Sequence, residues 1–198
     1  MSVTPTPTRI PQRVFLFSGH RVDAAGRTPP RFPLTLVDKA AAGIAAMLDA
    51  LGAGPDDLAL TQGANGGDLL FAEACLARRV PLRFLQPFDE ATFIEASVRG
   101  DPKLPEDWVA RYRKIRAQLI DPPLAAPTSL GPLPDGGDPY ERCNRWLLDS
   151  ALAWGAERLH FICLWNGDSG EAAGGTADMV AEVTRRGGTI HWLDTRNL

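Results

Sequence analysis

Short apolar runs alternate with longer amphipathic stretches along this chain. The run Val14–Phe17 is apolar at every position, which is typical of a strand buried on both faces of a parallel sheet. Four further runs predict strands of the same sheet: Leu58–Thr61, Leu82–Leu85, Leu159–Trp165 and Thr189–Leu193.

Between these runs, apolar residues recur at the spacing of a helix. In residues 35–51 they fall on one face, and Gly52 and Gly54 end the pattern. Further helices are predicted at 69–79, 89–98, 106–119, 140–154 and 176–186. The alternation predicts an α/β fold with a single doubly wound, mainly parallel sheet of about five strands, Rossmann-like, with helices on both faces.

Two segments fall outside this pattern. Residues 1–12 are rich in threonine and proline and predict a disordered N-terminal lead-in, so that the single domain spans 13–198. Residues 121–139 hold six prolines and three glycines and show no periodicity. Such a stretch indicates an insertion or a mobile lid.

Composition narrows the range of functions. The 198 residues are 44% apolar and 23% charged, which is ordinary for one globular domain. A net charge of −3 argues against a nucleic-acid partner, because duplex binding needs many cationic side chains. Three cysteines without metal-ligand spacing predict buried, reduced thiols in a cytoplasmic protein without a metal site. No apolar run is long enough to predict a membrane span.

The tripeptide Gly174-Gly175-Thr176 is the first candidate ligand loop. It follows the predicted strand Leu159–Trp165 and opens a predicted helix. Glycines let a backbone approach a ligand, and the unpaired N–H groups and dipole of a helix N-terminus attract an anion. Thr176 could donate its hydroxyl to a phosphate. The alternative is a plain helix start with a threonine cap.

A second glycine-rich loop also lies between a strand and a helix. Its candidate residues are Gly63, Asn65, Gly66, Gly67 and Asp68. The glycines would admit a ligand or merely turn the chain, and Asp68 would cap the helix that follows.

The order of strands determines whether the two loops meet. If Val14–Phe17 is central and pairs with Leu159–Trp165, the strand order reverses between Ser18-Gly19-His20 and Asn166. Ligands bind at such reversals, at the carboxyl ends of the strands. Gly66 and Gly175 should then lie at one shared edge of the sheet.

Several side chains near these loops could carry charge or chemistry. Arg21 suits a phosphate because its guanidinium donates in a fork, and Arg27 and Arg31 could extend a cationic rim. His20 could act in acid–base chemistry or simply pack, whereas His160 and His191 are predicted to be structural.

Two carboxylates are candidate acids. Glu73 faces the apolar stripe of its predicted helix, where it needs a partner or a raised pKa, or reaches solvent at the helix edge. Asp178 lies in the first turn of the helix after Gly175, where the dipole favours it in any case. Asn144 could hold a loop or touch the ligand, and Trp165 could stack on a base.

The loop motifs resemble those of the SLOG superfamily of Rossmann-like domains over about residues 13–194. The similarity rests on Ser18-Gly19-His20, the stretch from Gln62 to Asp68, and Gly174-Gly175-Thr176. It implies a nucleotide-like ligand at the two glycine loops and a fold that often dimerises. LOG-type phosphoribohydrolases of this superfamily place a glutamate where this chain has Met179, so an enzyme would need Glu73 or Asp178 instead.

Three functions follow as hypotheses. The first is the binding of a nucleotide or nucleotide-derived small molecule by a sensor or signalling module, without a further cofactor. The second is a nucleoside monophosphate N-glycosidase with a non-standard acid. The third is a non-catalytic protein interaction module, whose mark would be an exposed apolar patch.

Overall fold

The computed structural model describes residues 10–168 and 175–198, which form one α/β unit around a six-stranded, all-parallel sheet. The strand order is β4-β3-β2-β1-β5-β6. The strands are β1 (Val14–Gly19), β2 (Leu58–Thr61), β3 (Leu82–Gln86), β4 (Leu124–Ala125), β5 (Leu159–Trp165) and β6 (Thr189–Asp194). The predicted fold class is therefore confirmed, with one strand more than the five predicted.

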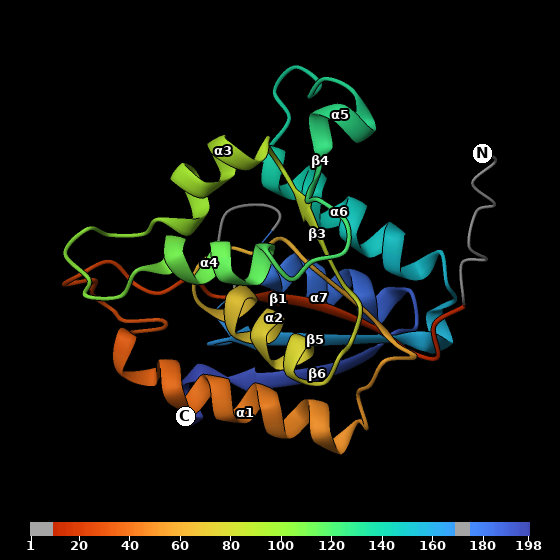
Figure 1. Ribbon diagram of the computed structural model, residues 1–198, viewed down its shortest axis with the longest axis horizontal. Coiled ribbons are helices and arrows are strands. Elements are labelled where there is room, and N and C mark those ends of the chain that lie inside the picture. The colour runs from red at the N-terminus through yellow and green to blue at the C-terminus, as the bar shows by residue number, and fades with distance from the viewer. Residues whose placement is uncertain (1–9, 169–174) are drawn as a thin grey trace.

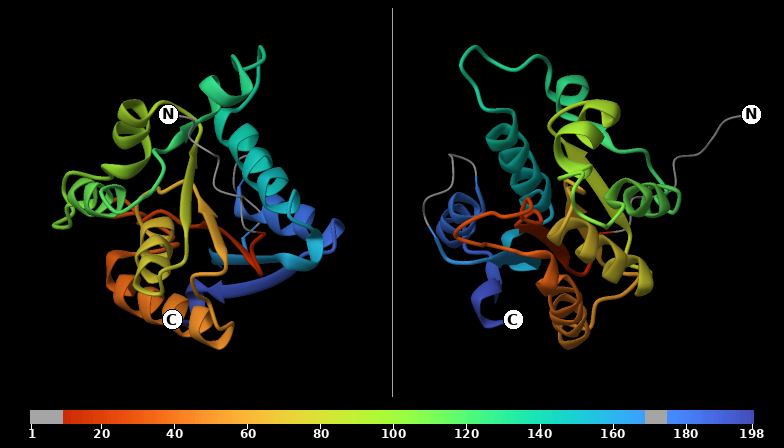
Figure 2. Two further views of the ribbon diagram at one scale, coloured as in Figure 1. Left: turned by 45° about the vertical axis from the view of Figure 1, so that its right-hand side comes forward. Right: turned by 90° about the vertical axis from the view of Figure 1, so that its left-hand side faces the viewer.

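Helices cover both faces of the sheet (Figures 1 and 2). One face carries α1 (Val37–Ala50), α2 (Gly67–Ala77) and α4 (Trp108–Arg116), and the other carries α6 (Pro139–Leu152) and α7 (Thr176–Arg185). The helix α3 (Glu90–Phe93) continues into a π-helical turn, Ile94–Val98. Short 3-10 turns lie at Leu34–Leu36, Ala156–Arg158 and Thr195–Asn197.

Each face of the sheet has its own apolar core, which explains why β1 is apolar throughout. Phe15 and Phe17 point to the side of α1, α2 and α4, where the Phe17 ring stacks on Phe71 at 4.8 Å between centroids. Val14 and Leu16 point to the side of α6 and α7. Alternate side chains of a strand face opposite sides, so a central strand between two helical layers needs apolar residues at every position.

The strand order reverses between β1 and β5. These strands pair in parallel from Val14 opposite Leu159 to Gly19 opposite Leu164. The chain leaves β1 toward the α1 face and leaves β5 toward α7 on the other face, so the two connections diverge and leave a crevice at the carboxyl ends. The predicted switch point is confirmed.

The proline-rich segment 121–139 contains more regular structure than its sequence predicts. Leu124–Ala125 pairs with Leu85–Gln86 as the edge strand β4, and α5 (Ala126–Leu130) follows directly. Figure 2 shows this segment projecting beyond the ends of α3 and α6. The strand was missed because two residues flanked by prolines give no detectable alternation. Within the described ranges, no helix combines the length and apolarity that a bilayer crossing requires.

The histidine pair on β5 and β6 gives the fold a pH dependence. His160 Nδ1 and His191 Nε2 lie 3.0 Å apart, and the rings stack at 5.2 Å between centroids. Burial lowers the pKa of both rings, and for His160 the neighbouring His191 and Arg13 lower it further. The folded protein thus binds protons less readily than the unfolded chain, so the pair stabilises above the ordinary histidine pKa and loses this effect as pH falls.

We therefore expect the stability advantage of the wild type over His191→Gln to shrink between pH 7.5 and pH 5.5. Urea denaturation of both proteins at each pH measures this difference and cancels the contributions of other titrating groups. An advantage that stays constant over this range would contradict a neutral histidine pair.

Candidate functional site

A pocket lies at the carboxyl ends of the central strands, where the loops after β1 and β2 meet the start of α7. Its volume is about 210 Å³. The described residues that line it are Phe17, Ser18, Gly19, His20, Arg21, Arg31, Gln62, Ala64, Asp68, Ser97, Tyr140, Asn144, Gly175 and Thr176. The loops of Gly66 and Gly175 thus border one pocket, as the strand order predicted.

The start of α7 faces this pocket. Gly175 occupies the N-cap position, so no side chain caps this helix. The buried Thr176 forms a hydrogen bond with Ser18, and the two hydroxyl oxygens lie 3.2 Å apart. Backbone N–H groups of the first turn, which an α-helix leaves without intrahelical partners, therefore lie at the same end of the pocket as two hydroxyls. Gly174, the other glycine of the predicted loop, lies outside the described residues.

Arg21 brings positive charge to the pocket wall. Its Nη1 donates to the carbonyl of Ala96 at 3.1 Å, which fixes the guanidinium although the residue keeps an exposed surface. Burial of the charged group lowers the pKa of Arg21, and Tyr140 and Asp68 act in the opposite direction. Because an arginine pKa starts above 12, the side chain stays cationic. Arg31 lines the same wall.

Asp68 is the single carboxylate among the described pocket residues. It is 6% exposed, and its Oδ2 accepts the backbone N–H groups of Gly63 at 3.1 Å and Ala64 at 3.2 Å. Burial raises the pKa of Asp68 to about 6, against the lowering effect of Ala64 and other hydrogen-bond donors. The predicted helix cap was wrong: α2 begins at Gly67 with Gly66 as its N-cap, and Asp68 reaches back into the loop.

The glycines of the second loop are required by packing. Gly66 has φ +82°, and a Cβ there would lie 2.8 Å from the carbonyl oxygen of His20 and from the nitrogen of Val22. The Gly67 N–H donates to that same His20 carbonyl at 3.1 Å. Gly63 has φ +88° and lies against the ring of Phe84. These three glycines shape the pocket from behind and do not line it.

Two buried asparagines tie the loops together. Asn65 accepts the N–H of Val22 and donates to the carbonyl of Val98, each at 3.2 Å. The backbone N–H of Asn166 donates to His20 Nε2 at 3.2 Å, and its side-chain Nδ2 donates to Asp168 at 2.6 Å. Only His20 of this set lines the pocket. Asn65 and Asn166 therefore position the walls rather than offer a ligand contact.

Asn144 connects the pocket to a second hollow. Its Oδ1 accepts a hydrogen bond from Gln62 Nε2 at 2.6 Å, so α6 and the β2 loop are joined at this point. Asn144 also lines a groove of about 480 Å³ between α6 and α7. Asp178 and Met179 lie in that groove and outside the pocket.

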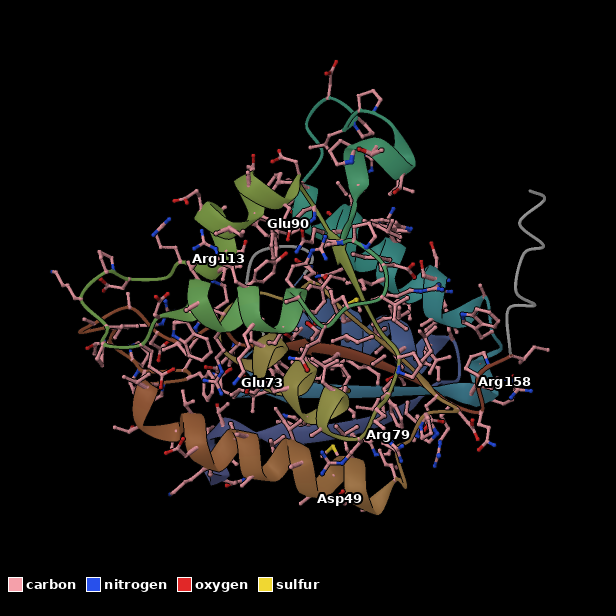
Figure 3. The ribbon with its side chains drawn as sticks, viewed as in Figure 1. Asp49, Glu73, Arg79, Glu90, Arg113 and Arg158 are labelled. Atoms are coloured by element: carbon pink, nitrogen blue, oxygen red, sulfur yellow. The ribbon has the colours of Figure 1, made fainter. Side chains whose placement is uncertain are left out.

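Two further predicted residues lie outside both hollows. Glu73 projects from α2 beside α4 (Figure 3), where Arg111 binds its two carboxylate oxygens at 2.6 and 2.7 Å. This ion pair supplies the partner that a carboxylate near the apolar stripe requires. The Trp165 ring packs against Trp192 at 5.7 Å between centroids, and the Trp192 ring nitrogen donates to the Trp165 carbonyl.

Some pocket residues have no signal in the sequence. The hydroxyls of Ser97 and Tyr140 lie 2.9 Å apart, although one belongs to the π-helical turn and the other to the first turn of α6. Neither belongs to a motif. Gln62 was detectable, since it directly precedes the glycine loop.

The donor set of the pocket suits an anion better than a metal ion. Within the described ranges, no group of three or more His, Cys, Asp or Glu side chains is placed to hold a metal. The polar donors are hydroxyls, amides and guanidinium groups, which bind phosphate or carboxylate oxygens. Comparisons with protein-family models and with curated protein sequences give no match for this chain.

Proposed function

We propose that this protein binds a nucleotide or nucleotide-derived small molecule and acts as a sensor or signalling module, in keeping with its resemblance to the SLOG superfamily. The observation that carries the proposal is the meeting of three elements at one pocket. These are the N-terminus of α7, the paired hydroxyls of Ser18 and Thr176, and the guanidinium of Arg21.

Each element favours a phosphate group. The helix N-terminus offers backbone N–H donors and a partial positive charge, and the hydroxyls add short hydrogen bonds. Arg21 adds a full charge in a partly enclosed site, where a charge-assisted hydrogen bond is stronger than at the open surface. A phosphate at Gly175 would therefore have donors from both sides of the switch point.

The two hollows provide room for the rest of a nucleotide. The pocket of about 210 Å³ is suited to a phosphate and sugar, and the groove of about 480 Å³ adjoins it at Asn144. Together they fall in the range of small-molecule sites. Leu148 and Met179 form a small apolar floor of the groove, and most of its other described lining residues are charged.

Removing a phosphate donor is expected to weaken binding. Thr176→Val keeps the side-chain shape and loses the hydroxyl, and Arg21→Gln loses the charge. Each should raise the Kd for the tightest-binding nucleotide by roughly 10-fold or more, the cost of a lost charge-assisted hydrogen bond. Isothermal titration with a panel of nucleoside monophosphates, cyclic nucleotides and NAD derivatives measures this.

Arg83→Gln is the matched control for the charge. Arg83 lies on β3 and approaches Asp121 at 3.7 Å, outside both hollows. Its replacement should leave every Kd unchanged. Absence of binding below the millimolar range across the whole panel would reject the proposed function.

One observation favours an N-glycosidase as a second candidate. A buried carboxyl in the pocket with a pKa of about 6 can exchange a proton near neutral pH, which an acid–base catalyst must do. In such a reaction water adds to the anomeric carbon, the bond to the base breaks, and the base leaves with a proton. Chromatography of nucleoside monophosphates incubated with the protein detects the free base. A lack of base release would exclude this candidate and leave the sensor proposal intact.

A further inference from the structure

Phosphate binding does not explain why a buried carboxylate, that of Asp68, lines the pocket. An anion-binding pocket gains nothing from a buried carboxylate, which repels the ligand and is costly to desolvate. Its hydrogen bonds to Gly63 and Ala64 could equally be accepted by an asparagine oxygen. A carboxylate is favoured only if something in the bound state donates to it.

The geometry leaves one oxygen available for such a donor. Among the described residues, both hydrogen bonds within 3.5 Å fall on Oδ2 of this pocket residue, and Oδ1 accepts none at that distance. The Thr61 hydroxyl and the Gln62 N–H lie near the same carboxyl and, like the N–H groups of Gly63 and Ala64, lower its pKa. The charged and titratable groups around it are Arg21, Arg31, His20 and Tyr140 in the pocket and the buried thiol of Cys143 behind it. The anion end of the pocket is formed by the start of α7, at Gly175 and Thr176, whereas Asp68 belongs to α2.

We propose that Asp68 accepts a hydrogen bond from a hydroxyl of the ligand. The pocket would then select phosphorylated compounds that carry a sugar hydroxyl, such as ribonucleotides, over anions that lack one. This inference rests on the proposed phosphate site and adds the class of group that Asp68 binds. A carboxylate that accepts from a hydroxyl forms a stronger bond than a neutral acceptor, which justifies keeping the charge in the pocket.

The test compares ligands that differ only in their hydroxyls. AMP, GMP, CMP and UMP are titrated against their 2′,3′-dideoxy counterparts and against inorganic phosphate. At pH 7.5 the best ribonucleotide should bind roughly 10-fold to 100-fold more tightly than its dideoxy form, as expected for a hydrogen bond to a charged group. At pH 5, where Asp68 is mostly protonated, this ratio should shrink.

Asp68→Asn supplies an independent readout. The variant should bring the ratio close to one while it still binds inorganic phosphate. Asp49→Asn, an acidic control at an exposed position of α1 outside both hollows, should keep the wild-type ratio. Equal affinities of ribonucleotide and dideoxynucleotide for the wild type at pH 7.5 would overturn the inference, whether or not the variant folds. Binding of phosphate without tighter binding of any ribonucleotide would also overturn it. If no phosphate compound binds at all, the proposed function fails first.

Discussion

Replacement of Gly66 by alanine is expected to lower the free energy of unfolding by about 3 kcal/mol. The backbone has φ +82° and ψ −128°, a conformation that a residue with a Cβ rarely adopts. The new Cβ would also lie 2.8 Å from two backbone atoms of the β1 loop, the His20 oxygen and the Val22 nitrogen. Backbone cannot rotate away as a flexible side chain can, so the loops must separate. Thermal denaturation should show a decrease in Tm of roughly 6–12 °C.

Gly136→Ala separates the two causes of this loss. Gly136 has φ +73°, but a Cβ at this position would meet nothing within 4 Å, so the variant carries the backbone strain without the collision. Gly136→Ala should lower the free energy of unfolding by about 1 kcal/mol. The difference between the variants then reports the contact between the β1 and β2 loops. Equal losses of free energy of unfolding in the two variants would show that the contact between the β1 and β2 loops is not rigid. Nucleotide binding by Gly66→Ala would show that the pocket does not depend on this contact.

Replacement of Asp68 by asparagine is expected to stabilise the unliganded protein at pH 7.5 by about 3 kcal/mol. The folded-state pKa of Asp68 is raised from 3.8 to about 6. A raised carboxyl pKa contributes stability below the unfolded pKa and loses it as pH rises through the folded value. At pH 7.5 the wild type therefore carries the cost of a buried charge, and a neutral amide of the same shape does not.

Chemical denaturation at two pH values tests the sign. The advantage of Asp68→Asn should be present at pH 7.5 and much smaller at pH 4.5, where the wild-type carboxyl is also neutral. Asp49→Asn, at an exposed position of α1 where the carboxylate pairs with Arg78, should change stability little at either pH. A destabilised Asp68→Asn at pH 7.5 would mean that the Gly63 and Ala64 hydrogen bonds outweigh the desolvation cost. Residues that serve a binding site often lower the stability of the unliganded protein.

The sheet could be predicted because its signal is local and repeated. Val14–Phe17 and Phe161–Trp165 are apolar throughout, and the patterns between strands have helical spacing, so the doubly wound order followed from general rules of connection. The short strand Leu124–Ala125 could not be predicted in the same way. Two residues make too small a pattern, and their pairing with β3 is a tertiary contact.

The candidate site was predictable in part, for a related reason. Ser18 lies at the end of β1, Arg21 in the loop after it and Thr176 at the start of α7, so the strand order is enough to bring them together. The glycines of the second loop were predictable as close-approach positions, although not which partner approaches them. Ser97 and Tyr140 come from segments whose meeting depends on the π-helical turn and on the path of α6. No periodicity encodes such a contact.

The pairing of β1 with β5 also constrains how the chain folds while it is being synthesised on the ribosome. The strands β1 to β4 emerge first and can associate with one another, whereas one edge of β1 keeps open hydrogen-bonding groups until β5 is synthesised. That exposed edge is a template for association with other nascent chains. Prematurely terminated products should therefore be prone to aggregate and, lacking α7, unable to capture an anion.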